Sequence, residues 1–395
     1  MLLFSMVTIE KIQSYFTLKN FATFVLVLFC IHYIPIETFG ISILKTTVSV
    51  ICCIVFIFSV PYVTKALVLA TIFFLTILFS AIFHMETFRV STLLYLCSFL
   101  ITFITLYNLV HVKQVFTLYY FIIIVKKLLC TLTIVLIIQQ TFIILGIHFF
   151  PLVNLMYFLD RGLGANSLTI EPSIFARMMG VLCYAYMECV SFRDGHKFRF
   201  RQLFEKEHKW VTYSFLWSML TMGSGTAFIV LGVLSLYFIT WRNTLIIIPF
   251  LAGLAYVGST MGIKQFNRAY DTVQATMTLN KDVVGKADGS AAYRIAPILN
   301  TINDLDLTKK EHWFGYGIDK GKAQVYDRMM GEITDYGFLA YIFGLILVFT
   351  CAIRFWSIPT IMYFIGIGGN TSNIAYGWGI LIVFMCVRYF YDNRK

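Results

Sequence analysis

The polar residue with the strongest functional signal is an arginine inside an apolar segment. Arg177 lies about one and a half helical turns beyond Pro172, within a stretch rich in apolar residues. An arginine inside the hydrocarbon region of a membrane is costly unless it faces a wet cavity or a partner, so it is a candidate functional residue. In an alternative interpretation, its side chain only extends to the membrane surface and has no further role.

Further arginines lie in segments that are less apolar. Arg161 precedes the apolar stretch that contains Arg177, and a long hydrophilic segment contains Arg268, Arg294 and Arg328. A guanidinium group binds phosphate through two parallel hydrogen bonds, whereas lysine acts as a point charge. Together these five arginines could hold a diphosphate at a membrane surface. In the alternative interpretation they are solvated, or paired with the acidic residues of the same segment.

The tract from His312 to Asp319 carries the candidate proton acceptors. His312 or the Asp319 carboxylate could take a proton from a hydroxyl group, and Arg268 could assist catalysis nearby. A histidine beside a tryptophan also suits a structural role. Gly315 and Gly317 indicate a tight turn or a substrate cleft, because this Gly-x-Gly lacks the third glycine and the Lys-Ser/Thr of a phosphate-binding loop.

Glu171 stands directly before Pro172, which suits the first turn of a helix, and a carboxylate is favourable at a helix N-terminus. Glu171 is a candidate residue of the substrate cleft, and in the alternative interpretation it only caps the sixth span beneath a turn. The nine cysteines include no CxxC pair, and no HExxH or GxSxG motif occurs. The sequence predicts no metal site and no cofactor.

The composition of the chain indicates the kind of fold that must position these residues. Apolar types make up 59% of the 395 residues, charged types only 13%, and the mean hydropathy is +0.80. A soluble domain carries about a quarter charged residues, so the class of soluble enzymes is excluded. The fold class is all-α, a polytopic transmembrane helical bundle. The net charge is +11, and lysines and arginines gather in the cytoplasmic loops of membrane proteins. Because this explains most of the positive charge, we predict no nucleic-acid partner.

The apolar stretches have the length that a hydrocarbon core of about 30 Å requires of helices. We expect about twelve spans, near residues 20–37, 41–60, 66–83, 90–110, 128–149, 172–190, 210–222, 225–240, 244–260, 336–353, 357–369 and 375–391. The loops assigned to one side hold more than half of the Lys and Arg residues, which predicts a cytoplasmic N-terminus and C-terminus. The span 210–222 is short. If it formed one span together with 225–240, the predicted side of the membrane would be inverted for every later segment.

Three regions follow from this assignment. Residues 1–260 are expected to form nine transmembrane helices with short loops, 261–335 one long periplasmic loop, and 336–395 the C-terminal transmembrane helices. A long ordered loop between spans is typical of a functional element. Residues 115–125 are too few to span a membrane, and we expect an amphipathic helix on the inner surface.

Several of these tracts resemble the O-antigen polymerase (Wzy) family and the related O-antigen ligases. Arg161 followed by Ile-Glu-Pro-Ser at 170–173 is similar to the arginine–glycine and Glu-Pro-Ser pattern of the family. The tract 223–227 is similar to a serine-rich tract at the start of the next outer-side span. The tract 313–317, followed by Asp-Tyr-Gly at 335–337, resembles the late outer loop, where relatives often carry Glu-x-Gly.

The resemblance implies a bacterial inner-membrane glycosyltransferase that uses an undecaprenyl-diphosphate-linked oligosaccharide and polymerises its repeat units into the O-antigen chains of lipopolysaccharide. It also implies a chain-length regulator and a flippase as partners. Ligases have a histidine near the Glu-x-Gly tract, whereas residues 325–334 contain none. This difference favours a polymerase, with a ligase as the alternative.

A polysaccharide flippase or another transporter is the alternative from a different class. About twelve spans suit a transporter, but transporters carry charges at the membrane midplane and show repeated halves. Here the spans do not pair into similar halves, and most of the polar candidates lie in one outer loop.

Overall fold

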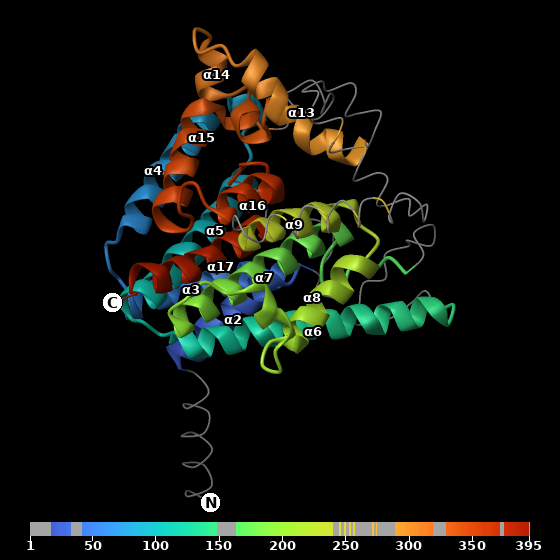
Figure 1. The fold of residues 1–395 in the computed structure, drawn as a ribbon. Helices are drawn as coiled ribbons and strands as arrows, with labels where there is room; N and C mark the ends of the chain where they lie inside the picture. Colours follow the sequence, from blue (N-terminus) through green and yellow to red (C-terminus); the bar gives the residue numbers. More distant parts are fainter. Residues whose placement is uncertain are drawn as a thin grey trace, which may run out of the picture.

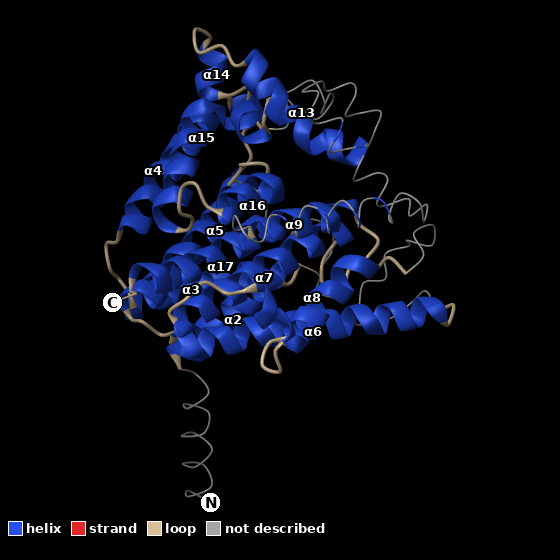
Figure 2. Ribbon diagram, in the orientation of Figure 1, coloured by secondary structure: helices blue, strands red, loops and turns tan. Residues whose placement is uncertain are grey.

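The computed structural model describes residues 17–32, 42–147, 163–239, 289–318, 329–371 and 375–394, together with single positions at 245, 249, 253, 256, 271 and 274. The described residues form helices joined by short loops, and no β-strand occurs among them (Figures 1 and 2). This confirms the all-α prediction for the described part of the chain.

The helices follow the order of the predicted apolar stretches. The α-helices are α2 (Leu18–Cys30), α3 (Ile43–Ser59), α4 (Lys65–Phe83), α5 (Val90–Tyr107), α6 (Leu118–Ile144), α7 (Pro172–Asp194), α8 (Lys209–Thr221), α9 (Gly225–Ser235), α13 (Gly289–Asp304), α14 (Lys310–Phe314), α15 (Gly331–Cys351), α16 (Ile358–Ile367) and α17 (Ala375–Asp392). Short helical turns are η1 (Met85–Thr87), η2 (Asn108–Val112), η4 (Phe200–Phe204) and η5 (Leu236–Phe238).

Five helices of the described chain are long and apolar enough to cross a membrane: α4, α5 with η2, α6, α7 and α15. The helices α2, α3, α9 with η5 and α16 are apolar but shorter. A membrane-embedded helical protein is therefore the class that the described residues support.

Contacts between helix termini define two ends of the bundle. At one end Lys19 of α2 lies 3.6 Å from the ring centre of Tyr120 in α6, and Lys126 donates a hydrogen bond to the carbonyl of Glu207 before α8. We call this the basic end. At the other end, His84 after α4 binds the carbonyl of Gly315 just beyond α14, and we call it the α14 end.

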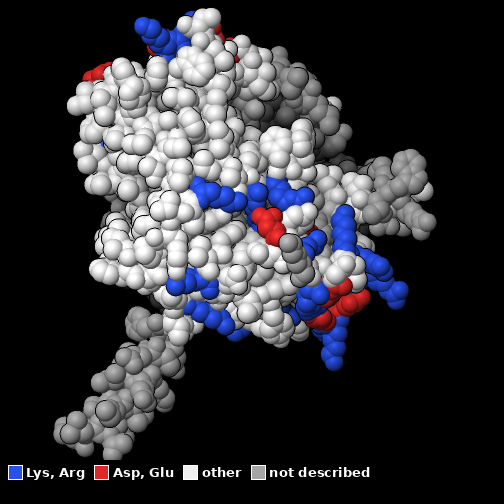
Figure 3. All heavy atoms as spheres, turned by 90° about the vertical axis from the view of Figure 1, so that its left-hand side faces the viewer, with Lys and Arg blue, Asp and Glu red and all other residues white. Residues whose placement is uncertain are grey.

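The helices alternate in direction between these ends. Figure 1 shows α6 along the bottom of the view, while α4 and α15 run side by side toward α14 at the top. Arg388 near the end of α17 donates to the carbonyls of Phe349 and Ile353 at the end of α15, so both helices finish at the same end. Arg394, just beyond α17, lies 3.8 Å from the ring centre of Phe192 near the end of α7, which places both helix ends at the basic end. Figure 3 views the face that lies on the left of Figure 1 and shows lysines and arginines gathered over its middle and lower parts.

Helices α7 and α17 lie at the centre of the bundle. In α7, 89% of the most apolar 18 residues are buried inside the structure, whereas the value is 33% in α4, which lies at the edge. A Cβ on Gly379 of α17 would lie 2.1 Å from the carbonyl oxygen of Phe29 in α2. Glycine at this position therefore permits the close approach of two helices.

One predicted element is wrong. Residues 115–125 do not form a separate amphipathic helix, because α6 runs without interruption from Leu118 to Ile144. The pair Lys126 and Lys127 suggested a boundary, but lysine is a good helix former, and no proline or glycine follows the pair before Gly146. At 1.5 Å per residue the 27 residues of α6 reach about 40 Å, so the helix can cross a membrane and extend beyond it.

The segment 210–240 forms two helices rather than one. Helix α8 ends beside the C-terminal part of α6, where Gln140 donates to the hydroxyl of Thr221 at 2.8 Å. Helix α9 with η5 returns to the basic end, where the Tyr237 hydroxyl lies 2.8 Å from that of Ser191 in α7. The positive φ of Gly223 permits the turn between them. The two helices therefore form an antiparallel pair.

Candidate functional site

The glycine tract after α14 packs directly on the start of α15. The amides of Tyr316 and Gly317 donate to the carbonyls of Thr334 and Asp335 at 2.7 and 3.2 Å. Gly337 interrupts α15 with φ of 90°, and a Cβ added to it would lie 2.1 Å from the Trp313 carbonyl oxygen. The tract and the Asp-Tyr-Gly passage, which lie apart in the sequence, therefore form one junction.

Gly315 and Gly317 serve this junction rather than a phosphate cradle. Both have positive φ, and a Cβ on Gly315 would lie 2.4 Å from the Asp335 carbonyl oxygen. A Cβ on Gly317 would lie 2.4 Å from the Thr87 hydroxyl. Both glycines are therefore required by the close approach of other segments, which matches the tight-turn interpretation of the sequence.

His312 is buried, and both of its ring nitrogens are used. Its Nδ1 accepts a hydrogen bond from the Asp306 amide at 2.7 Å, which requires an unprotonated Nδ1. Its Nε2 lies 3.1 Å from the Tyr316 hydroxyl, to which a neutral ring donates. Thr308 donates to the Asp306 carboxylate and lowers the pKa of that group. The geometry favours the structural interpretation of His312, as the residue that fixes the turn before α14.

Arg177 is 5% exposed and lies inside the bundle. Its Nη1 donates to the Gly366 carbonyl of α16 at 2.8 Å and to the Tyr376 hydroxyl of α17 at 2.9 Å. Its buried Nε has no hydrogen-bond partner among the described residues. The guanidinium therefore does not extend to the membrane surface, and one buried donor remains for another group.

Sequence reasoning missed two residues beside Arg177. His32 follows α2, and its ring lies 5.8 Å from that of Tyr376. The Nζ of Lys45, in the first turn of α3, lies 3.3 Å from His32 Nδ1, and the lysine is only 2% exposed. In the sequence, Lys45 is a single charge near the end of a predicted span, and nothing there assigns it to a site. We call His32, Lys45, Arg177 and Tyr376 the cationic cluster.

Glu332 was missed as well. It lies in the first turn of α15 and is 2% exposed. Its Oε2 accepts a hydrogen bond from the Thr371 amide at 2.5 Å, and its own amide donates to the Asn370 side chain at 3.3 Å. Segment 366–371 therefore contacts Arg177 at its first residue and Glu332 at its last. The only signal in the sequence was one acidic residue at the start of an apolar run.

Glu171 and Ser173 begin α7 at the α14 end. The Ser173 hydroxyl donates to the Glu171 carboxylate, and Pro172 occupies the first turn as predicted. The preceding loop is held by Gln139 of α6, which donates to the Ser167 carbonyl and accepts from the Ser167 amide. These bonds fix the described part of the loop before α7, residues 163–171.

The structure brings together only part of the predicted site. Arg177 lies in α7 and Glu171 directly precedes that helix, and His312, Gly315 and Gly317 share the junction with α15. Four predicted site residues lie outside the described residues: Arg161, Arg268, Asp319 and Arg328. Arg294 lies in α13, and its side chain is not described.

The chemistry available at the α14 end is cationic and acid–base. The cationic cluster can attract an anion. Glu332 is a buried carboxylate that contacts segment 366–371, as Arg177 does. Within the described residues, no group of three or more His, Cys, Asp or Glu side chains could hold a metal ion.

Comparison of the chain with protein-family models, curated proteins and solved structures gave no significant match.

Proposed function

We propose that the protein is a membrane glycosyltransferase that polymerises undecaprenyl-diphosphate-linked oligosaccharide repeat units into O-antigen chains at the periplasmic face of the bacterial inner membrane. The observation that carries the proposal is the buried Arg177, which keeps an unused donor. Tyr376 and His32 connect it to a second buried cation, Lys45. A diphosphate leaving group in a partly dry site needs such cations.

The reaction needs little else from the protein. A hydroxyl of the acceptor attacks the sugar carbon that bears the diphosphate, the carbon–oxygen bond to the diphosphate breaks, and a base takes the hydroxyl proton. The donor brings its own leaving group, so neither a nucleotide nor a metal is required. We propose Asp319 or Glu332 as the proton acceptor, since the nitrogens of His312 are occupied within its own turn.

The topology in this proposal has twelve spans with both termini in the cytoplasm. The alternation of the described helices between the basic end and the α14 end supports it, since α9 finishes at the basic end and α15 starts at the α14 end. One more crossing is needed between them, and the expected span 244–260 would supply it. The excess of basic residues at one end supports the cytoplasmic assignment.

Reporter fusions test this topology. Fusions at His196 and after Lys395 should report the cytoplasm, and a fusion near Asp288 should report the periplasm, because the span count places an odd number of crossings between His196 and Asp288. Activities of paired cytoplasmic and periplasmic reporters at each position give the measurement. A cytoplasmic signal at Asp288 would overturn the span count and the location of the site.

The loop arginines give a second test. At least one of Arg268→Ala, Arg294→Ala and Arg328→Ala should abolish the polysaccharide ladder, because one lost charge-assisted contact costs about 2–4 kcal/mol of barrier, or two to three decades in rate. The removal of a solvated arginine should leave the activation barrier almost unchanged. His312→Ala should be milder, because both ring nitrogens of His312 are used within its own turn, and Asp319→Ala should be milder unless Asp319 is the base. Membrane abundance by immunoblot is the control, and three normal ladders would exclude these arginines from the site.

Two other functions remain as alternatives. An O-antigen ligase would use the same cations but transfer a single chain to the lipid A core. A flippase or transporter could also use buried charges within its helices. The accumulation of single repeat units on the lipid carrier at the outer face in an inactive variant would favour polymerisation over both.

A further inference from the structure

We infer that the basic end of the bundle holds a binding site for a phosphate ester, carried either by an anionic phospholipid or by a soluble compound. The site lies at the opposite end from the cationic cluster and is independent of the proposed function. It is formed by Arg354, Arg394, Phe192 and Tyr391, with Glu188 and Lys197 beside them. We call these residues the arginine–aromatic site.

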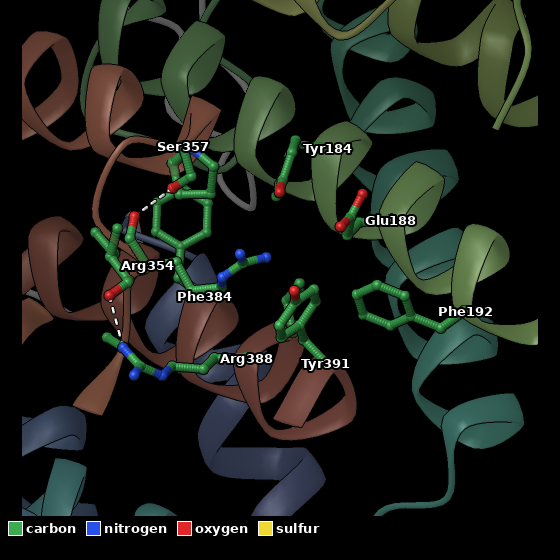
Figure 4. Close-up of a pocket in the computed structure, with 12 residues that line it drawn as sticks. Tyr184, Glu188, Phe192, Arg354, Ser357, Phe384, Arg388 and Tyr391 are labelled. Atoms are coloured by element: carbon green, nitrogen blue, oxygen red, sulfur yellow. Dashed lines mark hydrogen bonds between the residues drawn. The ribbon is translucent and has the colours of Figure 1, made fainter. Parts of the chain in front are cut away.

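Two hollows meet at this site. One has a volume of about 520 Å³ and is lined by residues that include Glu188, Phe192, Lys197, Tyr237 and Arg394. The other is smaller, shares Glu188 and Phe192, and adds Arg354 and Tyr391 (Figure 4). The volume of the larger hollow falls in the range of small-ligand sites, so a lipid headgroup fits it.

The two arginines lie flat against aromatic rings. The Cζ atom of Arg354 is 3.7 Å from the ring centre of Tyr391, and that of Arg394 is 3.8 Å from Phe192 and 5.2 Å from Tyr391. Stacking uses the face of a guanidinium and leaves the N–H groups at its edge available for hydrogen bonds. Two like charges against one ring repel each other, and an anion between them would relieve that repulsion.

Neighbouring arginines are bound to carbonyls or carboxylates of the described residues. Arg388 donates to two carbonyls of α15, and Arg193 binds the carboxylates of Asp194 and Glu207. Among the described residues, no carboxylate lies within ion-pair distance of Arg354 or Arg394. Their charges are therefore available to a phosphate, to which arginine makes strong two-point contacts.

Glu188 gives the site a feature that can be tested separately. Its Oε2 accepts a hydrogen bond from the Tyr237 hydroxyl at 3.0 Å. In Figure 4 the Glu188 carboxylate and the Arg354 guanidinium point into the same space, without an ion pair between them. The carboxylate repels any phosphate that enters, so its neutralisation should strengthen binding.

A titration of the purified full-length protein tests the site. The melting temperature is measured against phosphatidylglycerol, phosphatidylcholine and inorganic phosphate, since a ligand of the folded state raises it by mass action. Phosphatidylglycerol should stabilise the wild type and phosphatidylcholine should not. Arg354→Gln with Arg394→Gln should weaken the apparent affinity at least about tenfold, because two charge-assisted contacts are lost. The matched control, Arg199→Gln with Arg201→Gln, removes two exposed arginines near the same end and should leave the affinity unchanged.

Glu188→Gln should tighten binding, an effect that a variant with general structural damage would not produce. Stabilisation by inorganic phosphate with the same dependence on these variants, and none by phosphatidylglycerol, would support the site and identify a soluble ligand. Equal losses of affinity in the two double arginine variants would show that the ligand is attracted to the whole basic end. That result would overturn the site. An unchanged or weakened affinity in Glu188→Gln would overturn it as well, even if the double arginine variant does not fold.

Discussion

Arg177→Ala should abolish polymer formation while the protein still reaches the membrane. The guanidinium is the buried cation nearest to segment 366–371, and its loss removes the proposed contact to the diphosphate together with the bonds to Gly366 and Tyr376. Loss of one charge-assisted contact alone costs about 2–4 kcal/mol of barrier. Arg177→Lys should recover little, because an ammonium cannot bind Gly366, Tyr376 and a phosphate with the geometry of the guanidinium fork. The measurement is the surface polysaccharide ladder, with membrane abundance from an immunoblot.

Two control variants separate catalysis from folding. Tyr376→Phe removes one hydroxyl partner of Arg177 but keeps the charge, so it should reduce the ladder only modestly. Arg89→Ala removes an exposed arginine at the same end and should leave the ladder normal. A normal ladder in Arg177→Ala would reduce this residue to a structural tie between α7, α16 and α17.

Gly337→Ala should give the largest loss of stability among the glycine substitutions. Its φ of 90° disfavours any side chain, at a cost of about 1–2 kcal/mol, and the added Cβ would lie 2.1 Å from a backbone oxygen that cannot move alone. Overpacking of this kind costs about 1–3 kcal/mol more. We expect a clear fall in the melting temperature of the purified protein and little polymer in cells.

Gly331→Ala is the matched control for this substitution. It begins the same helix, is exposed, and has no neighbour within 4 Å of an added Cβ. Its melting temperature should stay at the wild-type value. If Gly337→Ala melts at the wild-type temperature too, then the packing of the glycine tract on the start of α15 is not what holds this junction together.

The fold class was predictable because a membrane imposes simple rules on composition. Helices such as α7 begin where Pro172 permits and end at Gly195, whose left-handed conformation closes the helix. The error at residues 115–125 has a physical origin. A lysine pair marks a preference for the membrane surface, but it does not end a helix, and α6 continues through it.

The candidate site was predictable only in part. Arg177 and the glycine tract carry local signals, an intramembrane charge and a backbone that needs glycine. His32, Lys45 and Glu332 become notable only when α2, α3 and α15 bring them to α16 and α17. No local pattern encodes such contacts, because they depend on tertiary packing between segments far apart in the chain.

The central claim is that the protein joins repeat units rather than moving them. The most direct measurement places purified protein in proteoliposomes with undecaprenyl-diphosphate-linked repeat units and resolves the products by size. We expect a ladder of lengthened chains and released undecaprenyl diphosphate from the wild type, and no ladder from Arg177→Ala. Transport of intact single units across the bilayer without any chain growth would contradict it.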